Sequence, residues 1–396
     1  MSEHNPGPRP PAPDPRPPAP DPRPPAPDPR PRAPAVQAPG PRWFLMAGGG
    51  TGGHVIPALA VARELRQRGH NAFFIGTERG LEAKLVPAEG FPLETIRIGG
   101  LKRVGWWRTA ATLIQLPGST VHAGRLIESH RVAAVFSMGG YVAGPPVIAA
   151  LIRQVPVVVM EPNAAPGFTN RRIAMFAARA LISFPETARY FRYGGTEITG
   201  LPVREEFFAL PAKARGEKFT VLVTGGSQGS RTLNQAARQS WPLFRQAGLP
   251  VRWIHQSGPA ACEEMRAAFA ECGLEGEVVP FIADMPCAFA EASLIVCRSG
   301  AGAVAELAAA GKPSILAPFP FAADQHQLRN AEAFARAGAA RLVRDSEMTG
   351  KKLFDTIAEL AAAPAAMERM GAAARGLSHP GAARRAAEIL LEAARV

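Results

Sequence analysis

The segment 46–58 constrains the fold most strongly, because five glycines there separate an apolar run from an amphipathic stretch. The apolar run 43–47 predicts a buried strand, and residues from about 58 to 68 predict a helix. A glycine turn between a strand and a helix directs backbone N–H groups and the helix dipole toward an anion. The segment therefore predicts a phosphate-handling loop in an α/β protein.

The order of residues in this loop suggests more specific functions. Gly48, Gly50 and Gly53 fit the G-x-G-x-x-G pattern of dinucleotide sites, but a strand-to-helix turn without a ligand fits that pattern equally well. His54 follows directly, and Pro57 is a residue typical of helix starts. A histidine at the mouth of such a loop can exchange a proton near neutral pH, although a buried structural histidine would also fit.

Strand and helix patterns alternate through two successive series. Strands are predicted at 43–47, 71–76, 93–98, 131–137, 155–160, 180–183 and 197–199, and then at 219–224, 251–255, 278–282, 294–297 and 314–317. A second glycine turn, 225–229, opens the second series. This alternation predicts two doubly wound parallel sheets in Rossmann-like domains, with ligands beyond the carboxyl ends of the strands in a shared cleft.

We expect three parts in the chain. Residues 1–41 repeat the unit Pro-Pro-Ala-Pro-Asp-Pro-Arg, which predicts a disordered tail, passive rather than partner-binding. Residues 42–204 and 205–396 would form the two domains, with a linker at about 205–218. Helical stretches at 351–360 and 365–394 would cover the second sheet and could cross back to the first.

Charge and composition limit the classes of partner. The net charge of +12, from 45 basic and 33 acidic residues, favours anionic partners, but no basic block indicates nucleic-acid binding. The four cysteines lack C-x-x-C spacing, and neither D-x-D nor H-E-x-x-H occurs, so we expect no metal and no bound cofactor. Without a signal peptide or an apolar run of about 18 residues, the protein is expected in the cytosol.

One basic segment combines charge with large apolar residues. Trp106 and Trp107 stand beside Lys102, Arg103 and Arg108, a mixture typical of a membrane interface. The alternative is that both tryptophans belong to the core at the start of a helix.

Several polar residues follow predicted strands, where binding sites form. Gly225 to Gly229 and Arg204 could hold phosphates, and Glu306 could accept hydrogen bonds from both hydroxyls of a ribose. Other candidates for sugar or polar contacts are Gln327, Asn330, Glu161 and Asn163. Ordinary ion pairs, turn chemistry or surface polarity could explain each of them singly.

Taken together, the motifs resemble the MurG family over residues 42–396, in the family's order. They are Gly-Gly-Thr-Gly-Gly-His before Pro57, Met138–Tyr141, Glu161-x-Asn163, Pro202-Val203-Arg204, Gly225–Gly229, Arg298–Ala301 with Glu306, and His326-Gln327 with Asn330-Ala331. The resemblance implies a GT-B fold and the inverting transfer of GlcNAc from UDP-GlcNAc to the 4-hydroxyl of the muramoyl sugar of lipid I, giving lipid II. It also implies that the protein acts at the cytoplasmic face of the membrane, as a peripheral protein bound to anionic lipid. Contact with other cell-wall synthesis proteins could follow from the same resemblance.

The resemblance also assigns roles to individual residues. Donor contacts would come from Thr51, Gly52, Gly53, Asn163, Arg204, Ser227, Gln228, Ile282, Ala301, Gly302, Ala303, Val304, Ala305, Glu306 and Gln327. Within this set, Arg204 and Ser227 would hold the diphosphate, Ile282 the uracil and Glu306 the ribose. The membrane patch would contain Val104, Trp106, Trp107, Arg108 and Leu113. As the base that takes the acceptor proton, His54 is the first candidate and Glu161 the second.

Three other functions are compatible with parts of the sequence. A nicotinamide oxidoreductase would use the first glycine turn and Glu78, but would leave the second turn, Glu306 and Gln327 unexplained. A UDP-GlcNAc epimerase would need no lipid acceptor, and a non-catalytic scaffold would need no base. The chain departs from the family pattern at Pro162, Leu201 and Gly302-Ala303, all expected at the cleft wall.

Overall fold

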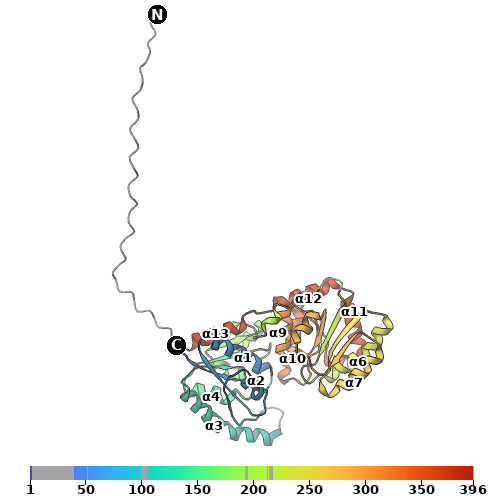
Figure 1. Cartoon of the computed structure of the whole chain (residues 1–396). Helices are drawn as coiled ribbons and strands as arrows, with labels where there is room; N and C mark the ends of the chain where they lie inside the picture. The colour runs from blue at the N-terminus through green and yellow to red at the C-terminus, as the bar shows by residue number, and fades with distance from the viewer. Residues whose placement is uncertain are drawn as a thin grey trace. The chain divides into compact units, whose positions relative to one another are not determined.

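The computed structural model describes residues 1, 40–50, 52–99, 105–191, 195–211, 213 and 217–395, without the side chains of 105–113. Contacts divide the chain into Met1–Gly40 and Pro41–Val396 (Figure 1). The predicted tail falls almost wholly outside the described residues, and everything below concerns the second unit.

The first sheet contains seven parallel strands in the order β3-β2-β1-β4-β5-β6-β7. Their bounds are β1 Trp43–Ala47, β2 Asn71–Gly76, β3 Leu93–Thr95, β4 Val132–Ser137, β5 Val157–Glu161, β6 Arg179–Ile182 and β7 Thr196–Ile198. The strand order reverses between β1 and β4, where the loops after these strands diverge and leave a crevice for ligands. The first glycine turn follows β1 and therefore lies at this crevice.

The second sheet repeats the arrangement with six parallel strands in the order β10-β9-β8-β11-β12-β13. The bounds are β8 Phe219–Thr224, β9 Val251–Gln256, β10 Gly276–Val279, β11 Leu294–Cys297, β12 Ser314–Leu316 and β13 Arg341–Leu342. Its reversal lies between β8 and β11, so the second glycine turn occupies the place that the first turn has in its own sheet.

Helices cover both faces of both sheets. They are α1 Gly52–Gln67, α2 Glu82–Ala88, α3 Gly105–Ser129, α4 Gly144–Ile152, α5 Phe168–Ile173, α6 Arg231–Ala247, α7 Cys262–Cys272, α8 Met285–Glu291, α9 Ala301–Ala310, α10 His326–Arg336, α11 Gly350–Ala361, α12 Pro364–Gly376 and α13 Ala382–Ala393. Because side chains alternate along a strand, Phe44 and Met46 face α1 and α13, whereas Leu45 and Ala47 face α3 and α4. Both faces are buried, which explains why β1 reads as an unbroken apolar run.

The last helix, α13, packs on α1 of the first sheet (Figure 1). Its buried residues Ile389 and Leu390 join the core beneath β1. The chain between α12 and α13 turns at Gly381, which has a φ of +76°. The continuous helical stretch expected at 365–394 is therefore wrong, because residues 377–381 carry the chain from one sheet to the other.

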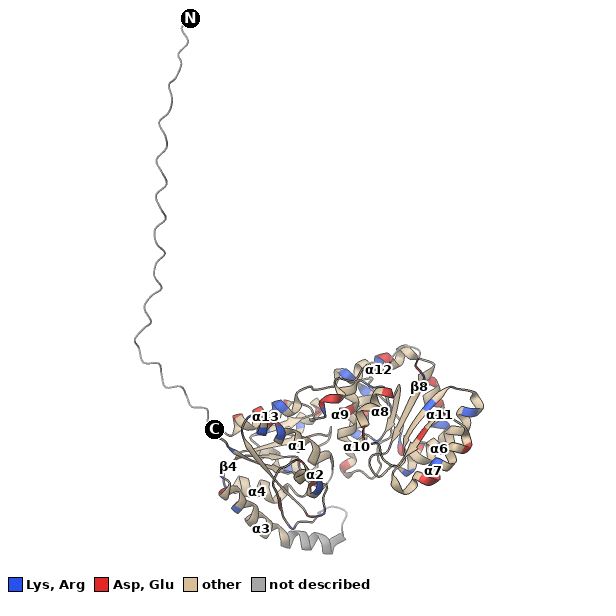
Figure 2. Ribbon diagram, in the orientation of Figure 1, with Lys and Arg blue, Asp and Glu red and all other residues tan. Residues whose placement is uncertain are grey.

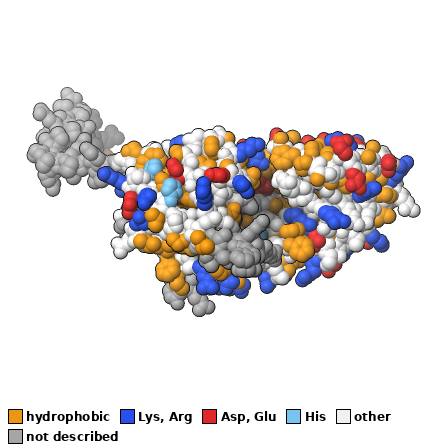
Figure 3. Space-filling model, turned by 90° about the horizontal axis from the view of Figure 1, so that it is seen from below, with side chains coloured by type: hydrophobic (Ala, Val, Ile, Leu, Met, Phe, Trp, Pro, Cys, Tyr) orange, Lys and Arg blue, Asp and Glu red, His pale blue; other side chains and the backbone are white. Residues whose placement is uncertain are grey.

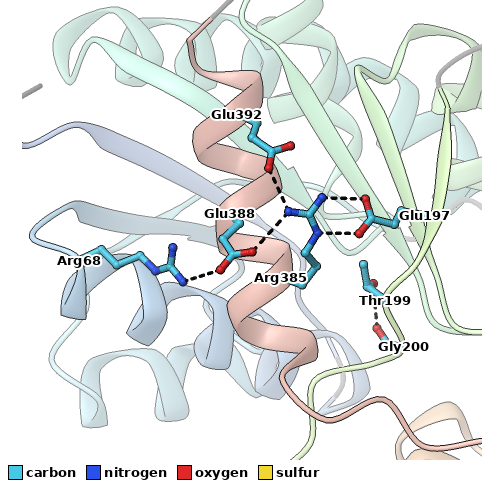
Figure 4. Close-up of polar contacts among 7 residues, drawn as sticks. All are labelled: Arg68, Glu197, Thr199, Gly200, Arg385, Glu388 and Glu392. Atoms are coloured by element: carbon cyan, nitrogen blue, oxygen red, sulfur yellow. Dashed lines mark hydrogen bonds and ion pairs between the residues drawn. The ribbon is translucent and has the colours of Figure 1, made fainter. Parts of the chain in front are cut away.

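Ion pairs fasten α13 to the first sheet (Figure 4). Arg385 binds both carboxylate oxygens of Glu197 in β7, at 2.6 and 3.0 Å, and also contacts Glu392 at 2.9 Å. Glu388 accepts a bond from Arg68 after α1 at 3.1 Å. Figure 2 shows acidic and basic residues together along this helix.

The predicted α/β class with two Rossmann-like, doubly wound domains is confirmed. The predicted bounds of β1, β2, β8 and β11 match the structure. The other predicted strands differ from the structure by one or more residues at an end, and β10 spans Gly276–Val279 rather than 278–282. In addition, α1 begins at Gly52 rather than near Ala58, and β13 was not predicted.

Candidate active site

The turns after β1 and β4 border the crevice of the first sheet. A Cβ atom on Gly48 would lie 2.7 Å from Cβ of Met138, so only glycine fits there. Gly50 has a φ of +86°, and its missing Cβ would lie 3.5 Å from the ring of Tyr141. Gly52 and Gly53 begin α1, whereas Thr51 lies outside the described residues.

In the first turn, a carboxylate of the protein itself, that of Glu82, occupies a backbone N–H group. The Gly50 N–H, one of the groups predicted to face a phosphate, donates to Oε2 of Glu82 at 2.7 Å. Glu82 also accepts bonds from the backbone and hydroxyl of Thr77, both at 2.9 Å, and it is fully buried. The sequence interpretation missed Glu82, because nothing in its spacing shows that its side chain turns back into the loop.

His54 lies in the first turn of α1, at the edge of this loop. Its Nδ1 lies 3.2 Å from the carbonyl oxygen of Gly49, and a Cβ on Gly140 would lie 3.4 Å from its ring. Burial lowers the pKa of His54; the Gly49 bond and the charge of Glu82 oppose this, while His326 of the second half reinforces it. The imidazole is therefore biased toward its neutral form, which a general base requires.

Glu161, the second candidate base, is enclosed at the end of β5. Only 1% of it is exposed, and its carboxylate accepts four bonds, from the backbone and amide of Asn163, from Gly167 N and from Asn170 Nδ2. Burial raises its pKa, and these bonds oppose the rise. The contacts favour a role in orienting Asn163, and a direct catalytic role stays a prediction.

Asn330 links the two halves rather than facing a sugar. Its Oδ1 accepts a bond from Ala164 N at 2.9 Å, and its Nδ2 donates to Asn163 Oδ1 and Ser299 O, both at 3.1 Å. It is fully buried on α10. The proposed sugar-bracketing role of Asn330 therefore does not fit, whereas Asn163 sits between Glu161 and this link.

The second glycine turn is open, in contrast to the first. Ser227 and Gln228 are exposed, and Ser230 caps α6 by accepting a bond from Leu233 N at 3.3 Å. A turn of exposed backbone before a capped helix of 17 residues can bind a diphosphate.

Gln256, which was not predicted from the sequence, holds this turn in place by hydrogen bonds from its buried side. Its buried amide donates to Gly226 O at 2.8 Å and to Thr224 Oγ1 at 3.2 Å. Its Oε1 accepts a bond from Ile282 N at 2.9 Å. One side chain therefore fixes the distance between the predicted phosphate and uracil contacts.

Glu306 and Arg204 lie close enough to influence each other electrostatically. Burial raises the pKa of Glu306 to about 7, and the charge of Arg204 opposes the rise. Arg204 is exposed and lies 5.1 Å over the ring of Phe207, and no ion pair is recorded for it among the described residues. Its charge is therefore available to a ligand.

The remaining predicted donor contacts lie at the ends of β11 and β12. Residues 301–306 form the first turn and a half of α9, and each is at least partly buried. Gln327 accepts a bond from Phe319 N at 3.0 Å, which orients its amide toward Gly300, whose missing Cβ would lie 4.0 Å away. For the membrane patch, Val104 and the side chains of Trp106, Trp107, Arg108 and Leu113 lie outside the described residues.

An apolar cavity of about 450 Å³ lies between the halves. It is next to residues 200–203 and 376–379, the two segments in which the chain passes from one half to the other. Both halves line it: Pro162, Phe184 and Leu201 contribute from one side, and Ala305 and Phe334 from the other. Pro162 and Leu201 are two of the departures from the family pattern, so at these positions the chain adds apolar surface to this cavity. The sequence interpretation did not predict it.

Known proteins share both halves of this architecture. Residues 44–182 match the glycosyltransferase family 28 N-terminal domain, and residues 220–386 match the glycosyltransferase family 28 C-terminal domain. A protein of Solibacter usitatus is 68% identical over 352 residues, which cover 89% of this chain and 96% of that protein. It is named UDP-N-acetylglucosamine--N-acetylmuramyl-(pentapeptide) pyrophosphoryl-undecaprenol N-acetylglucosamine transferase.

Solved structures agree with this similarity. The crystal structure of Acinetobacter baumannii MurG is 32% identical, with a TM-score of 0.76 over 89% of this chain and all of that one. A UDP-GlcNAc 2-epimerase from Neisseria meningitidis reaches a TM-score of 0.63 at 12% identity, covering 88% of this chain and 99% of that one. Identity that low shows a shared fold alone.

Proposed function

Because this chain belongs to the MurG family of glycosyltransferases, we propose that it moves GlcNAc from UDP-GlcNAc to lipid I, forming lipid II for peptidoglycan synthesis. The acceptor atom is the 4-hydroxyl of the muramoyl sugar. The observation that carries the proposal is that His54 lies beside the glycine turn at the crevice of the first half, while the exposed turn 226–228 lies at the corresponding place in the second half. A base and a leaving-group site thus belong to opposite halves, as a transfer between two substrates requires.

The donor would lie against the second half. Backbone N–H groups of the turn 225–229, with Ser227 and Gln228, would bind the diphosphate, and Arg204 would add a positive charge. The carboxylate of Glu306 would accept bonds from the ribose hydroxyls, and Ile282 would lie against the uracil. Gln327 would contact the sugar, while Gly52, Gly53 and Asn163 would close the site from the first half.

The transfer would be a single displacement with inversion. Nε2 of neutral His54 takes the proton of the acceptor hydroxyl while that oxygen bonds to the anomeric carbon. The bond between this carbon and the phosphate oxygen breaks, and UDP leaves with the electron pair. Arg204 and the N-terminus of α6 stabilise the developing charge, so we propose that no metal is needed.

The alternatives have less support. An oxidoreductase would need the first turn for a pyrophosphate, but Glu82 occupies the Gly50 N–H there. The likeness to epimerases extends to the fold alone. A non-catalytic scaffold would not need a neutral histidine at the crevice.

Membrane association is a further part of the proposal. Exposed apolar residues lie on α3 and α4, which pack together, at Ile114, Val121, Ile148 and Ile152, and just after α5 at Met175 and Phe176. On one face of the N-terminal half, Figure 3 shows hydrophobic side chains next to Lys and Arg side chains. Among the described residues, no helix is long and apolar enough to cross a bilayer. We therefore propose peripheral binding to anionic lipid at the cytoplasmic face, with the basic tryptophan segment contributing.

The membrane proposal can be tested by co-sedimentation with vesicles. Ile152→Asp should reduce binding to vesicles that contain phosphatidylglycerol, because Ile152 is 68% exposed and a charge there disfavours insertion. Ala365→Asp on α12 introduces the same charge away from the patch and should bind as the unmodified protein does. Equal binding of both variants would contradict the proposed surface.

The activity is tested by UDP release from UDP-GlcNAc in EDTA, with and without a lipid I analogue. We expect release only with the acceptor. Release without acceptor would indicate a hydrolase or epimerase, and donor binding without release would indicate a scaffold. His54→Ala should lower turnover by about 10²-fold or more while donor binding persists, because a positioned general base contributes about 10²–10⁴-fold.

A further inference from the structure

Glu82 is a buried carboxylate that the proposed mechanism does not use. It begins α2, and its residue surface is fully buried. Burial alone would raise its pKa, but the hydrogen bonds from Gly50 and Thr77 outweigh this effect and lower the pKa. Glu82 is therefore a carboxylate at neutral pH, with a fixed negative charge beneath the first turn.

Three glycines make room for this carboxylate. A Cβ on Gly49 would lie 2.5 Å from Oε1 of Glu82, and a Cβ on Gly76 or Gly80 would also collide with its side chain. Gly49 lies in the loop after β1, Gly76 ends β2 and Gly80 lies in the loop after β2, so two separate strand ends are shaped around one side chain. Such a cradle indicates that the position of the charge is specified.

A single peptide unit connects Glu82 to His54. The N–H of Gly50 donates to Glu82 at 2.7 Å, and the carbonyl of Gly49, in the same peptide plane, lies 3.2 Å from Nδ1 of His54. A carboxylate bound to the N–H end polarises the amide and makes its carbonyl a stronger acceptor. That carbonyl favours the tautomer with the proton on Nδ1, which leaves Nε2 as the nitrogen able to accept a proton.

We propose that Glu82 is a positioning residue for the transfer reaction, acting on His54 through the peptide between Gly49 and Gly50. The inference rests on the proposed role of His54 as the base. The arrangement corresponds to a carboxylate that orients a histidine in a hydrolase triad, with a backbone amide inserted between the two.

The geometry also determines a pH signature. Among the described residues, two ionisable groups act on His54: Glu82 from α2, whose charge favours the imidazolium, and His326 from α10, whose charge disfavours it. The ring of Tyr141 lies 3.5 Å from the position that a Cβ on Gly50 would take. Replacing Glu82 by a neutral residue removes the favourable charge, so His54 should lose its proton at a lower pH.

The test is a double-mutant cycle with Glu82→Gln and His54→Ala. Glu82→Gln should lower kcat by about tenfold or more, as a part of the roughly 10²–10⁴-fold contribution of a general base. The KM for UDP-GlcNAc should stay within about twofold, since Glu82 is fully buried and is not among the residues proposed to bind the donor. The acid limb of the kcat profile, measured at saturating UDP-GlcNAc, should move to lower pH, and the double variant should be no slower than His54→Ala alone.

Glu89→Gln is the matched control. It removes one negative charge just after the same helix, where Glu89 pairs with Arg63 on the surface at 2.8 Å. It should leave both kcat and the pH profile unchanged. If Glu82→Gln does not fold, Thr77→Val removes one bond to Glu82 but keeps its charge, so it should lower kcat by a smaller factor and leave the acid limb in place.

The outcomes separate this inference from the proposed function. Near-normal turnover in His54→Ala would show that His54 is not the base. The proposed role of Glu82, which depends on that function of His54, would then fall as well. If His54→Ala is impaired, normal kcat in Glu82→Gln, or a loss that multiplies with the His54 loss, would overturn the inference alone. A shift of the acid limb to higher pH would also overturn it.

Discussion

Among single residues, Glu306 should make donor binding depend on pH. Its pKa of about 7 means that it gains a proton as the pH falls through neutrality and then loses acceptor capacity for the ribose. The KM for UDP-GlcNAc should therefore rise below about pH 7. Glu306→Gln should raise the KM at high pH and abolish its pH dependence, which initial rates at varied donor concentration would reveal.

Two controls sharpen this prediction. Arg204 lowers the pKa of Glu306, so Arg204→Ala should move the KM transition to higher pH. A raised carboxyl pKa also means that the folded state binds the proton more tightly, so this group's contribution to stability falls as the pH rises from about 4.5 to about 7. Glu306→Gln should flatten that part of the unfolding free energy profile. A wild-type KM independent of pH would contradict the ribose role.

Gln256 should matter for both stability and donor affinity. Gln256→Met keeps the size of the side chain but leaves Gly226 O and Ile282 N without their bonds, which costs about 1–3 kcal/mol for a buried polar group. We expect lower stability in urea and a higher KM for UDP-GlcNAc. Gln246→Met, on the exposed end of α6, is the control and should change neither.

At the scale of secondary-structure elements, α13 should be held by its apolar face more than by its ion pairs. Leu390 is fully buried, so Leu390→Ala should lower the unfolding free energy by about 2–5 kcal/mol. Arg385 and Glu197 are each 39% exposed, so Arg385→Ala should cost about 0–1 kcal/mol. Urea unfolding at low and high salt would separate the two, because salt should weaken only the second effect.

The elements that the sequence predicted well share one property. Strands β1, β2, β8 and β11 are buried apolar runs ending at turn residues or polar residues, so their bounds could be read directly. Strand β10 was misplaced because it starts with Gly276, whose φ of +136° and close approach to Trp253 come from pairing with β9. The break before α13 could have been predicted from Pro380-Gly381, whereas the two-residue strand β13 had no detectable pattern.

The site was only partly predictable for a related reason. His54, Ser227 and Glu306 lie in the turns after strands or in the first two turns of the helices that follow, so topology places them near the carboxyl edges of the sheets. Glu82 begins α2, Gln256 ends β9 and Asn330 lies within α10, and for each of them the direction of the side chain decides its role. Such directions are determined by tertiary packing, which spacing in the sequence does not encode.

For the molecule as a whole, the two halves should unfold together as long as Asn330 links them. Each half has its own core, and the buried contacts between them include Asn330 with Asn163, and Phe184 with Phe334 at 6.4 Å between ring centroids. Asn330→Ala removes an acceptor for Ala164 N and a donor to Asn163 and Ser299. The cost should be about 1–3 kcal/mol, because buried partners lose their bonds.

The measurement that checks this prediction is calorimetry of the full chain. Weaker coupling between two separate cores should broaden the transition of Asn330→Ala or split it in two, and the van't Hoff enthalpy should fall below the calorimetric one. Arg336→Ala is the matched control, since it breaks an exposed pair with Glu186 across the same boundary and should cost only about 0–1 kcal/mol. If both variants unfold in one sharp transition, the cavity-side apolar contacts rather than Asn330 must couple the halves, and Phe334→Ala should then separate them.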